Sequence, residues 1–188
     1  VVRNEKEITF IKADKINFED SSSETEENEF LKKEFNQISL EKIGLDSVIT
    51  ETLKFRFEEM KRCLSANAPL SVIFLAGSSL EGILLGMALK HPKEFNQSKM
   101  SPKDQYGKVK KFPDWTLSNF IDVASDVGLL MEDVRKFSHS LRDFRNYIHP
   151  YEQVSTGFNP DKHTASICWQ VVKASIYQLT KNSIKPVS

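Results

Sequence analysis

The sequence predicts an all-α protein built as a bundle of about five helices, with an extended N-terminal arm. From residue 40 onward, apolar residues recur every three to five positions, as they do on the buried face of a helix. Capping residues and prolines separate these stretches. The longest apolar stretch, residues 69–89, is interrupted by Glu81, three serines and three glycines and has no basic flank before it. We therefore interpret it as a buried core helix and expect no membrane span.

Residues 1–39 are predicted to precede the bundle, which spans residues 40–182 and is followed by a tail over residues 183–188. Residues 7–18 (EITFIKADKINF) alternate apolar and polar side chains, which is typical of a short strand or an extended arm. Residues 19–29 (EDSSSETEENE) are acidic and serine-rich, which predicts a mobile linker. We therefore expect an N-terminal sensor domain or a regulatory partner beyond the bundle itself.

The first two helices of the bundle follow from their apolar pattern and their boundaries. Residues 40–64 carry a regular apolar stripe and form an amphipathic helix. Asn67 and Pro69 then stand where an N-cap and a first-turn proline begin a new helix. Because this second helix is apolar on all sides as far as residue 89, it belongs at the centre of the bundle.

Three more helices follow a long loop over residues 91–115, which contains three prolines. Thr116 can cap the third helix, and residues 131–148 form the fourth. Asn159-Pro160 opens the fifth helix. The buried stripe of the fifth helix consists of Ala165, Cys168, Val171, Val172, Ile176 and Leu179.

Charge and cysteine content narrow the function classes. The 26 basic and 26 acidic residues balance, so no global field attracts the chain to nucleic acid. Residues 70–188 hold 15 basic and 11 acidic residues, so any polyanion site is expected there. Cys63 and Cys168 are the only cysteines, which argues against a zinc site and indicates a reducing compartment. We expect a cytoplasmic protein with no metal and no cofactor.

The fourth helix ends in LRDFRNYIHP, residues 141–150, which places several polar side chains beside an apolar seam. The seam residues are spaced three and four apart: Val134, Phe137, Leu141, Phe144 and Ile148. A second stripe runs next to it and consists of Ser138, Arg142, Arg145 and His149, with Asn146 just beyond. Such a border stripe can face a cleft or a partner helix.

Pro150 predicts where the fourth helix stops. A residue before proline is disfavoured in α geometry, so the helix should end at Ile148 or His149. His149 would then lie at a helix C-terminus. There a histidine can act as a general acid or base near neutral pH.

These residues resemble a known family. LRDFRNYIHP resembles the signature of the HEPN superfamily, whose helical domains carry an arginine, a following polar residue and, four to six positions on, a histidine. FLAGSSLEG (74–82) is similar to the small-residue and glutamate motif in the central helix of many prokaryotic members. DWTLSNFIDVASDVGLL (114–130) resembles their third helix. The similarity spans roughly residues 40–182.

The resemblance implies a metal-independent endoribonuclease whose site is shared across a homodimer, of the kind found in prokaryotic defence and toxin systems. Strand scission by the ribose 2′-OH needs a base, an acid and cations around the phosphorane, and two copies of one histidine can supply both proton transfers. The motif arginine is either Arg142, followed by Asp143, or Arg145, followed by Asn146. The expected catalytic residues are Arg142, His149, Arg145 and Asn146, supported by Glu81, Ser138 and Asp143.

Other readings stay open beside this one. A non-catalytic helical module that binds RNA, a nucleotide or a partner protein is the alternative function. Glu81 is expected to pair with Arg145 or Arg142 inside the bundle, since a carboxylate among apolar residues needs a partner. The residues expected to contact RNA, unless they are simply solvated or packed, are Lys108, Lys110, Lys111, Tyr147 and Tyr151. His91, His139 and His163 form no recognisable constellation and receive no role.

Overall fold

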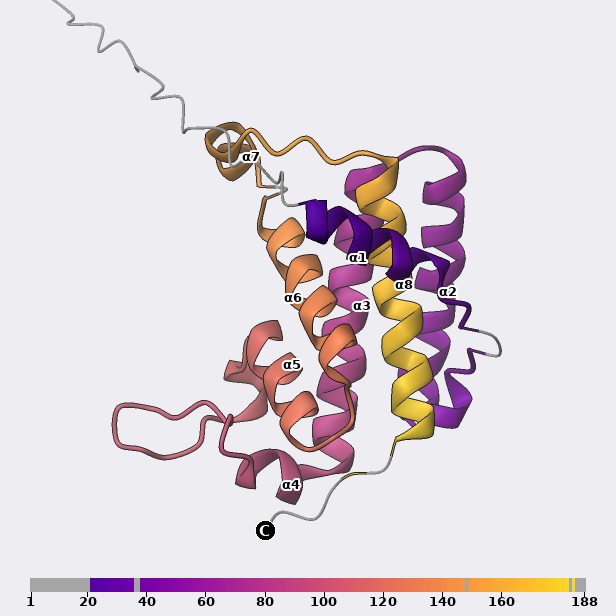
Figure 1. Ribbon diagram of the computed structural model, residues 1–188. Coiled ribbons are helices and arrows are strands. Elements are labelled where there is room, and N and C mark those ends of the chain that lie inside the picture. Colours follow the sequence, from indigo (N-terminus) through magenta and orange to yellow (C-terminus); the bar gives the residue numbers. More distant parts are fainter. Residues whose placement is uncertain (1–20, 36–37, 148, 183, 185–188) are drawn as a thin grey trace, which may run out of the picture.

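The computed structural model describes residues 21–35, 38–147, 149–182 and 184, and the regular elements of this part are all helical (Figure 1). The α-helices are α1 Ser21–Lys32, α2 Ser47–Ser65, α3 Pro69–Lys90, α4 Pro92–Gln97, α5 Leu117–Asp126, α6 Glu132–Tyr147, α7 Pro150–Thr156 and α8 Lys162–Lys181. Short 3-10 turns cover Glu41–Ile43 (η1) and Phe112–Asp114 (η2). The prediction of an all-α protein is confirmed.

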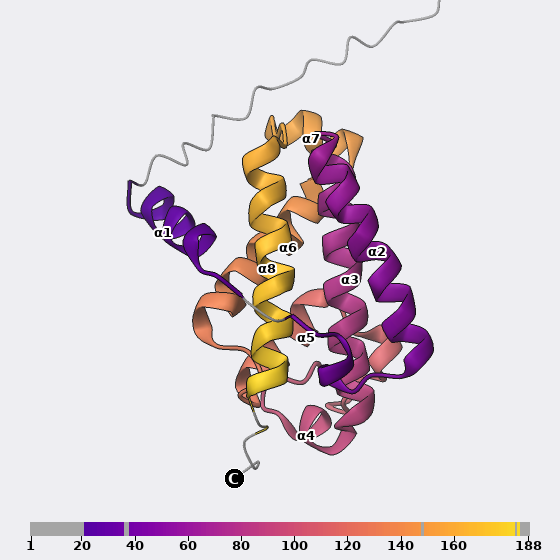
Figure 2. The ribbon, with the colours of Figure 1, turned by 90° about the vertical axis from the view of Figure 1, so that its right-hand side faces the viewer.

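Helix α3 lies at the centre of the bundle, as its uniform apolar character predicts (Figures 1 and 2). It packs against α8, α2, α5 and α6. By length and composition alone α3 could cross a membrane. However, 56% of its most apolar window is buried inside the bundle, as in the core helix of a soluble protein.

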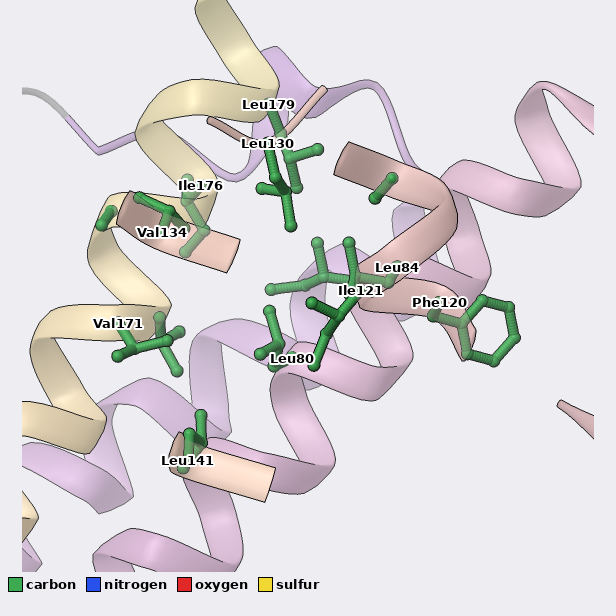
Figure 3. Packing of buried hydrophobic residues seen from close by; sticks show 14 of the residues in the cluster. Leu80, Leu84, Phe120, Ile121, Leu130, Val134, Leu141, Val171, Ile176 and Leu179 are labelled. Atoms are coloured by element: carbon green, nitrogen blue, oxygen red, sulfur yellow. The ribbon is translucent and has the colours of Figure 1, made fainter. Parts of the chain in front are cut away.

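The core is a cluster of aliphatic and aromatic side chains that come mainly from α3, α5, α6 and α8, with further members from α1, α2 and α4 (Figure 3). Side chains from these helices converge on it: Leu80, Leu84, Ile121, Val134, Leu141, Val171 and Ile176. All six residues of the predicted stripe of the fifth helix are buried, and all but Ala165 belong to this cluster. Two turns of α6 have side chains buried in this core. The buried side chains fix the rotation of α6 about its own axis, and this sets the directions in which its polar side chains point.

The five predicted helices are all present as α2, α3, α5, α6 and α8, with some shifted starts. Helix α2 begins only after η1, where the Asp46 carboxylate accepts a hydrogen bond from the Val48 N–H. The prediction of Asn67 as the N-cap of α3 is wrong: Ala68 holds that position, and Asn67 has a φ of 54°. The capping box at Thr116 and Asn119 begins α5 as predicted.

The predicted linker over residues 19–29 is wrong for the part that the structure describes, because α1 begins at Ser21. The Phe30 side chain is only 1% exposed and stacks on Phe137 of α6, with 4.2 Å between the ring centroids. Gln170 of α8 donates hydrogen bonds to the carbonyls of Phe30 and Lys33. One buried phenylalanine contributes about 1.5–3 kcal/mol, which offsets the weak helix preference of the residues before it. The arm expected over residues 7–18 lies outside the described residues, as does most of the tail.

The short helices α4 and α7 and the 3-10 turn η2 were not predicted. Helix α4 and η2 lie within the predicted loop of residues 91–115, where Phe95 and Trp115 are buried in the core. Helix α7 follows α6 directly, with Pro150 at its first position and Gly157 in the left-handed region at its end. The same proline that ends one helix therefore begins the next.

Candidate functional site

Helix α6 presents its polar residues on two sides of its buried seam. Val134 and Leu141 are fully buried and Phe137 nearly so. Phe144 is half-buried and stacks on Phe158, with 5.4 Å between nearly parallel rings. Ile148, the last residue of the predicted seam, lies outside the described residues.

On one side of α6, Arg145 reaches Glu81 of the central helix, so Arg145 is the one of the two predicted partners that Glu81 contacts. Its Nη1 donates a hydrogen bond to Glu81 Oε2 over 2.6 Å. A Cβ at Gly77, one turn before Glu81, would lie 2.7 Å from Arg145 Cδ, so the absence of a side chain at Gly77 gives the arginine its path. About a third of each side chain in the pair is exposed, so the ion pair is half-buried rather than enclosed. This explains the small-residue and glutamate motif of α3 in structural terms.

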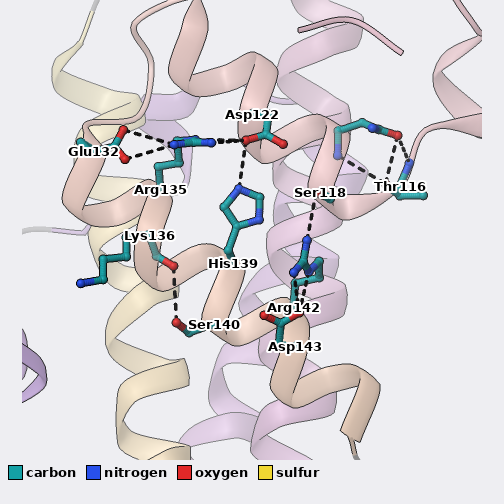
Figure 4. A network of polar contacts seen from close by, with 11 residues as sticks. Thr116, Ser118, Asp122, Glu132, Arg135, Lys136, His139, Ser140, Arg142 and Asp143 are labelled. Carbon is teal, nitrogen blue, oxygen red and sulfur yellow. Dashed lines mark hydrogen bonds and ion pairs between the residues drawn. The ribbon is translucent and has the colours of Figure 1, made fainter. Parts of the chain in front are cut away.

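On the other side of α6, Arg142 faces α5 (Figure 4). Its Nε donates to Asp143 Oδ1 over 2.9 Å, and its Nη1 donates to Ser118 Oγ over 3.0 Å. Arg142 is therefore neither a freely solvated arginine nor a neighbour of Glu81. The structure separates the two predicted motif arginines and gives each its own carboxylate.

His149 is exposed in the short connection between α6 and α7. The prediction of a helix C-terminus is right only in part. The His149 N–H donates to the Asn146 carbonyl at the end of α6, but the residue is also the N-cap of α7 and has extended backbone angles. Asn146 is exposed as well. The imidazole and the Asn146 amide thus lie at the surface beside the last turn of α6.

Ser138 does not lie in a cleft, contrary to the predicted border stripe. Its side chain is fully buried, and its Oγ has no hydrogen-bond partner. At about 100° per residue, Ser138 lies roughly 60° from Leu141, between Arg145 at roughly 40° and Arg142 at roughly 100°. Its short side chain is enclosed by the helices that α6 packs against, whereas the long arginine side chains reach the surface. Ser138 is therefore a core residue in the described part of the chain.

The predicted RNA-binding residues are divided between the two ends of the bundle. Lys108, Lys110 and Lys111 are exposed on the loop next to α4, at the opposite end from α7 (Figures 1 and 2). Tyr147 is half-buried, and its ring contacts Phe158. Tyr151 is 90% exposed in α7. Of these five residues, the two tyrosines lie near His149 in the chain and in space, and the lysines do not.

The sequence assigned no role to His139, but the structure pairs it with Asp122 of α5 (Figure 4). Its Nε2 lies 3.0 Å from Asp122 Oδ1, and the same oxygen accepts two hydrogen bonds from Arg135. Burial alone would raise the pKa of the Asp122 carboxyl, but the hydrogen bonds from Arg135 and His139 outweigh it and hold the pKa below its ordinary value.

This cluster continues the row of Arg142 along α6. Arg135, His139 and Arg142 are spaced four and three apart, so they share one face of the helix. That spacing was visible in the sequence. The partner, Asp122, lies on another helix, and no local pattern points to it.

In chemical terms, the second half of α6 offers two guanidinium groups on different sides of the helix, each about a third exposed, and the connection that follows offers one exposed imidazole. The arrangement suits binding of a phosphate group and proton transfer at a surface. Among the described residues, no group of three or more His, Cys, Asp or Glu side chains gathers as a metal site would require. Comparisons of the chain with models of known protein families, with curated proteins and with solved structures found no match.

Proposed function

We propose that this chain is a metal-independent endoribonuclease that acts as a homodimer, as the resemblance to the HEPN superfamily implies. In this proposal His149 takes the proton of a ribose 2′-OH, whose oxygen attacks the adjacent phosphorus. The 5′ oxygen leaves with a proton from the His149 of a second copy. The products are a 2′,3′-cyclic phosphate end and a 5′-OH end. A role in prokaryotic defence or in a toxin system, in the cytoplasm, belongs to the same proposal.

One observation carries it. The exposed imidazole of His149 directly follows the two turns of α6 that hold Arg142 and Arg145. About a third of each arginine side chain, 31% and 35%, is open to solvent. A phosphate could therefore reach a guanidinium group without unfolding of the helix.

A specific observation favours the alternative, a non-catalytic module that binds RNA, a nucleotide or a partner protein. Both arginines already have carboxylate partners, Arg142 in Asp143 and Arg145 in Glu81. A phosphate must compete with these carboxylates for the guanidinium groups. Arginines held in this way also serve to rigidify a helix without any reaction.

Incubation with RNA in the presence of EDTA separates the two functions. The wild-type protein should cut RNA, leave DNA of the same sequence intact and produce 2′,3′-cyclic phosphate ends. His149→Ala should lower the rate by about 10²–10⁴-fold for each proton transfer that the residue serves. Arg142→Lys should also lower it, because an ammonium cannot replace a planar two-pronged donor.

His91→Ala is the matched control, since His91 lies at the far end of α3 and should retain full activity. Because His149 is exposed, its replacement should leave the unfolding temperature nearly unchanged. Folded wild-type protein that binds RNA but leaves it intact would support the non-catalytic module. Cleavage that survives in His149→Ala would place the active site elsewhere.

A further inference from the structure

The central helix is not covered on all sides. The uncovered face of α3 carries residues spaced 4, 3, 4, 3 and 4 apart, which we call the α3 strip: Ser71, Leu75, Ser78, Gly82, Leu85 and Leu89. All six are exposed or half-buried, whereas the opposite face of α3 is buried. This alternation of four and three is the spacing of the seam along which two helices pack in a coiled coil.

The strip is open where a partner helix would approach most closely. A Cβ placed on Gly82, in the middle of the strip, would have no atom within 4 Å. By contrast, Gly77 and Gly86 on the flanks are filled by Arg145 and by Leu45. The missing side chain at Gly82 leaves room there for a second backbone at the interaxial distance of about 8–10 Å that packed helices adopt.

Large apolar side chains stand at both ends of the strip. Leu89 is 64% exposed at one end. At the other end Phe74 is 58% exposed and lines a groove of about 420 Å³, together with Leu70, Leu75, Ser71 and Glu59. Exposure of several large apolar side chains along one helix is costly in water and is typical of an interaction surface.

Charged side chains of both signs border the strip. Arg145 pairs with Glu81 on the α6 side, and on the α2 side Arg56 donates to Ser78 Oγ over 2.8 Å. Glu59 of α2 lines the groove beside Phe74. A border that holds both signs favours a partner that also holds both, as a second copy does.

We propose that the α3 strip is the surface through which two copies of this chain pair, with their α3 helices side by side and parallel. In this arrangement Gly82 faces Gly82 of the second copy, and the Leu85 and Leu89 side chains pack against their counterparts, as in a parallel coiled coil. Helix α3 has 22 residues and spans about 33 Å, which accommodates three heptads.

The parallel orientation rests on the proposed function. Helix α6 runs antiparallel to α3, and its last turns lie beside the first half of α3, as the contact of Arg145 with Gly77 and Glu81 shows (Figure 1). Parallel α3 helices therefore place both His149 residues at the same end of the dimer, whereas antiparallel helices place them at opposite ends. A site that draws one proton-transfer group from each copy requires the parallel pairing.

Cysteine cross-linking tests the surface and the orientation together, in a Cys63→Ser background that leaves only the buried Cys168. Under mild oxidation, Gly82→Cys and Ser71→Cys should each give a disulfide-linked dimer. Tyr106→Cys, at an 84% exposed site outside the strip, should remain monomeric on a denaturing gel. A cross-link at Gly82→Cys without one at Ser71→Cys would overturn the parallel arrangement, and no cross-link at either would overturn the surface.

Sedimentation provides the second readout. The wild-type chain should sediment as a dimer at about 10–50 µM, and Leu89→Glu should shift it to a monomer. Met131→Glu, a matched change at a 58% exposed site outside the strip, should leave the dimer unchanged. A wild-type monomer at these concentrations, including one that binds lipid vesicles through α3, would overturn the proposal.

The RNA assay distinguishes this inference from the proposed function. A dimer that forms through the α3 strip but leaves RNA intact supports the interface and rejects the nuclease. Cleavage by a chain that stays monomeric rejects the interface and retains the nuclease.

Discussion

At the scale of single residues, the hydrogen-bond partners of Arg142 and Arg145 determine where each guanidinium group lies in the candidate site. Arg142 and Arg145 are three positions apart in the chain, yet one faces α5 and the other faces α3. Gly77 decides the second contact, because any side chain there would occupy the path of Arg145. A substitution at Gly77 in α3 should therefore change the position of the Arg145 side chain in α6.

Gly77→Ala should destabilise the protein, although alanine is the better helix former. The added methyl group would lie 2.7 Å from Arg145 Cδ and would displace the arginine from Glu81. We expect a net loss of about 1 kcal/mol in the free energy of unfolding. Gly82→Ala, where the space is open, should instead gain about 1 kcal/mol from helix propensity. Urea unfolding of dilute, monomeric protein measures the free energy of unfolding of both variants. Equal effects at the two glycines would contradict the close packing of Arg145.

Asp122 should contribute stability that depends on pH. Its pKa is lowered in the folded state from an unfolded value of about 3.9, so its contribution is complete above that value and is lost as the pH falls through the folded pKa. At pH 7, Asp122→Asn should unfold more easily than the wild type by about 1–2 kcal/mol. The difference should shrink below a pH of about 4.

Asp114→Asn, at an exposed carboxyl group, serves as the control in the same unfolding series. A difference that stays constant down to pH 2 would show that charge on Asp122 is not the cause.

At the scale of helices, α1 shows how little apolar surface is needed to order a polar segment. It rests on the bundle through Phe30 and Leu31, and its charged residues pair with those of other helices. Lys33 contacts Asp133, and Glu26 contacts Lys136 of α6. These exposed pairs contribute little each, so the buried ring should dominate.

Phe30→Ala should release α1 from the bundle. Loss of a fully buried phenylalanine costs about 3–5 kcal/mol where the cavity persists. Here the cost should appear first as local unfolding of α1, since this helix makes few other buried contacts. Limited proteolysis should then cut within residues 21–32 while the remaining bundle stays resistant. Glu29→Ala, at an exposed site of the same helix, should change neither the stability of α1 nor the digestion pattern. An unchanged digestion pattern in Phe30→Ala would mean that α1 is held by its polar contacts.

At the scale of the whole molecule, the formal net charge is zero, so the protein has no overall electrostatic field that attracts RNA. The 26 basic and 26 acidic residues cancel, and the loop lysines lie at the opposite end from His149 (Figure 1). Any RNA contact near His149 must therefore depend on a few phosphate contacts made by arginines.

RNA affinity should consequently show a shallow salt dependence. With two or three phosphates neutralised, the slope of log K against log salt should be about −1.4 to −2.1, a loss of about tenfold between 50 and 200 mM. Arg142→Ala should reduce the slope by about 0.7, and Lys110→Ala should leave it unchanged. Fluorescence anisotropy with a labelled single strand provides the measurement. A slope near −5, or one that depends on Lys110, would show that the lysine loop is the main contact.

The sequence by itself determined the helical class, the central position of α3 and the buried stripe of α8, and it narrowed the partner of Glu81 to Arg145 or Arg142. These features depend on periodicity and on the cost of leaving a carboxylate unpaired among apolar residues, and both can be read along the chain. Only the tertiary structure decided that Arg142 turns to α5, that His139 meets Asp122, that Phe30 holds α1 and that the α3 strip is open. The physical reason is that each of these contacts joins residues far apart in the chain, and their distance is set by how the helices pack rather than by any local spacing.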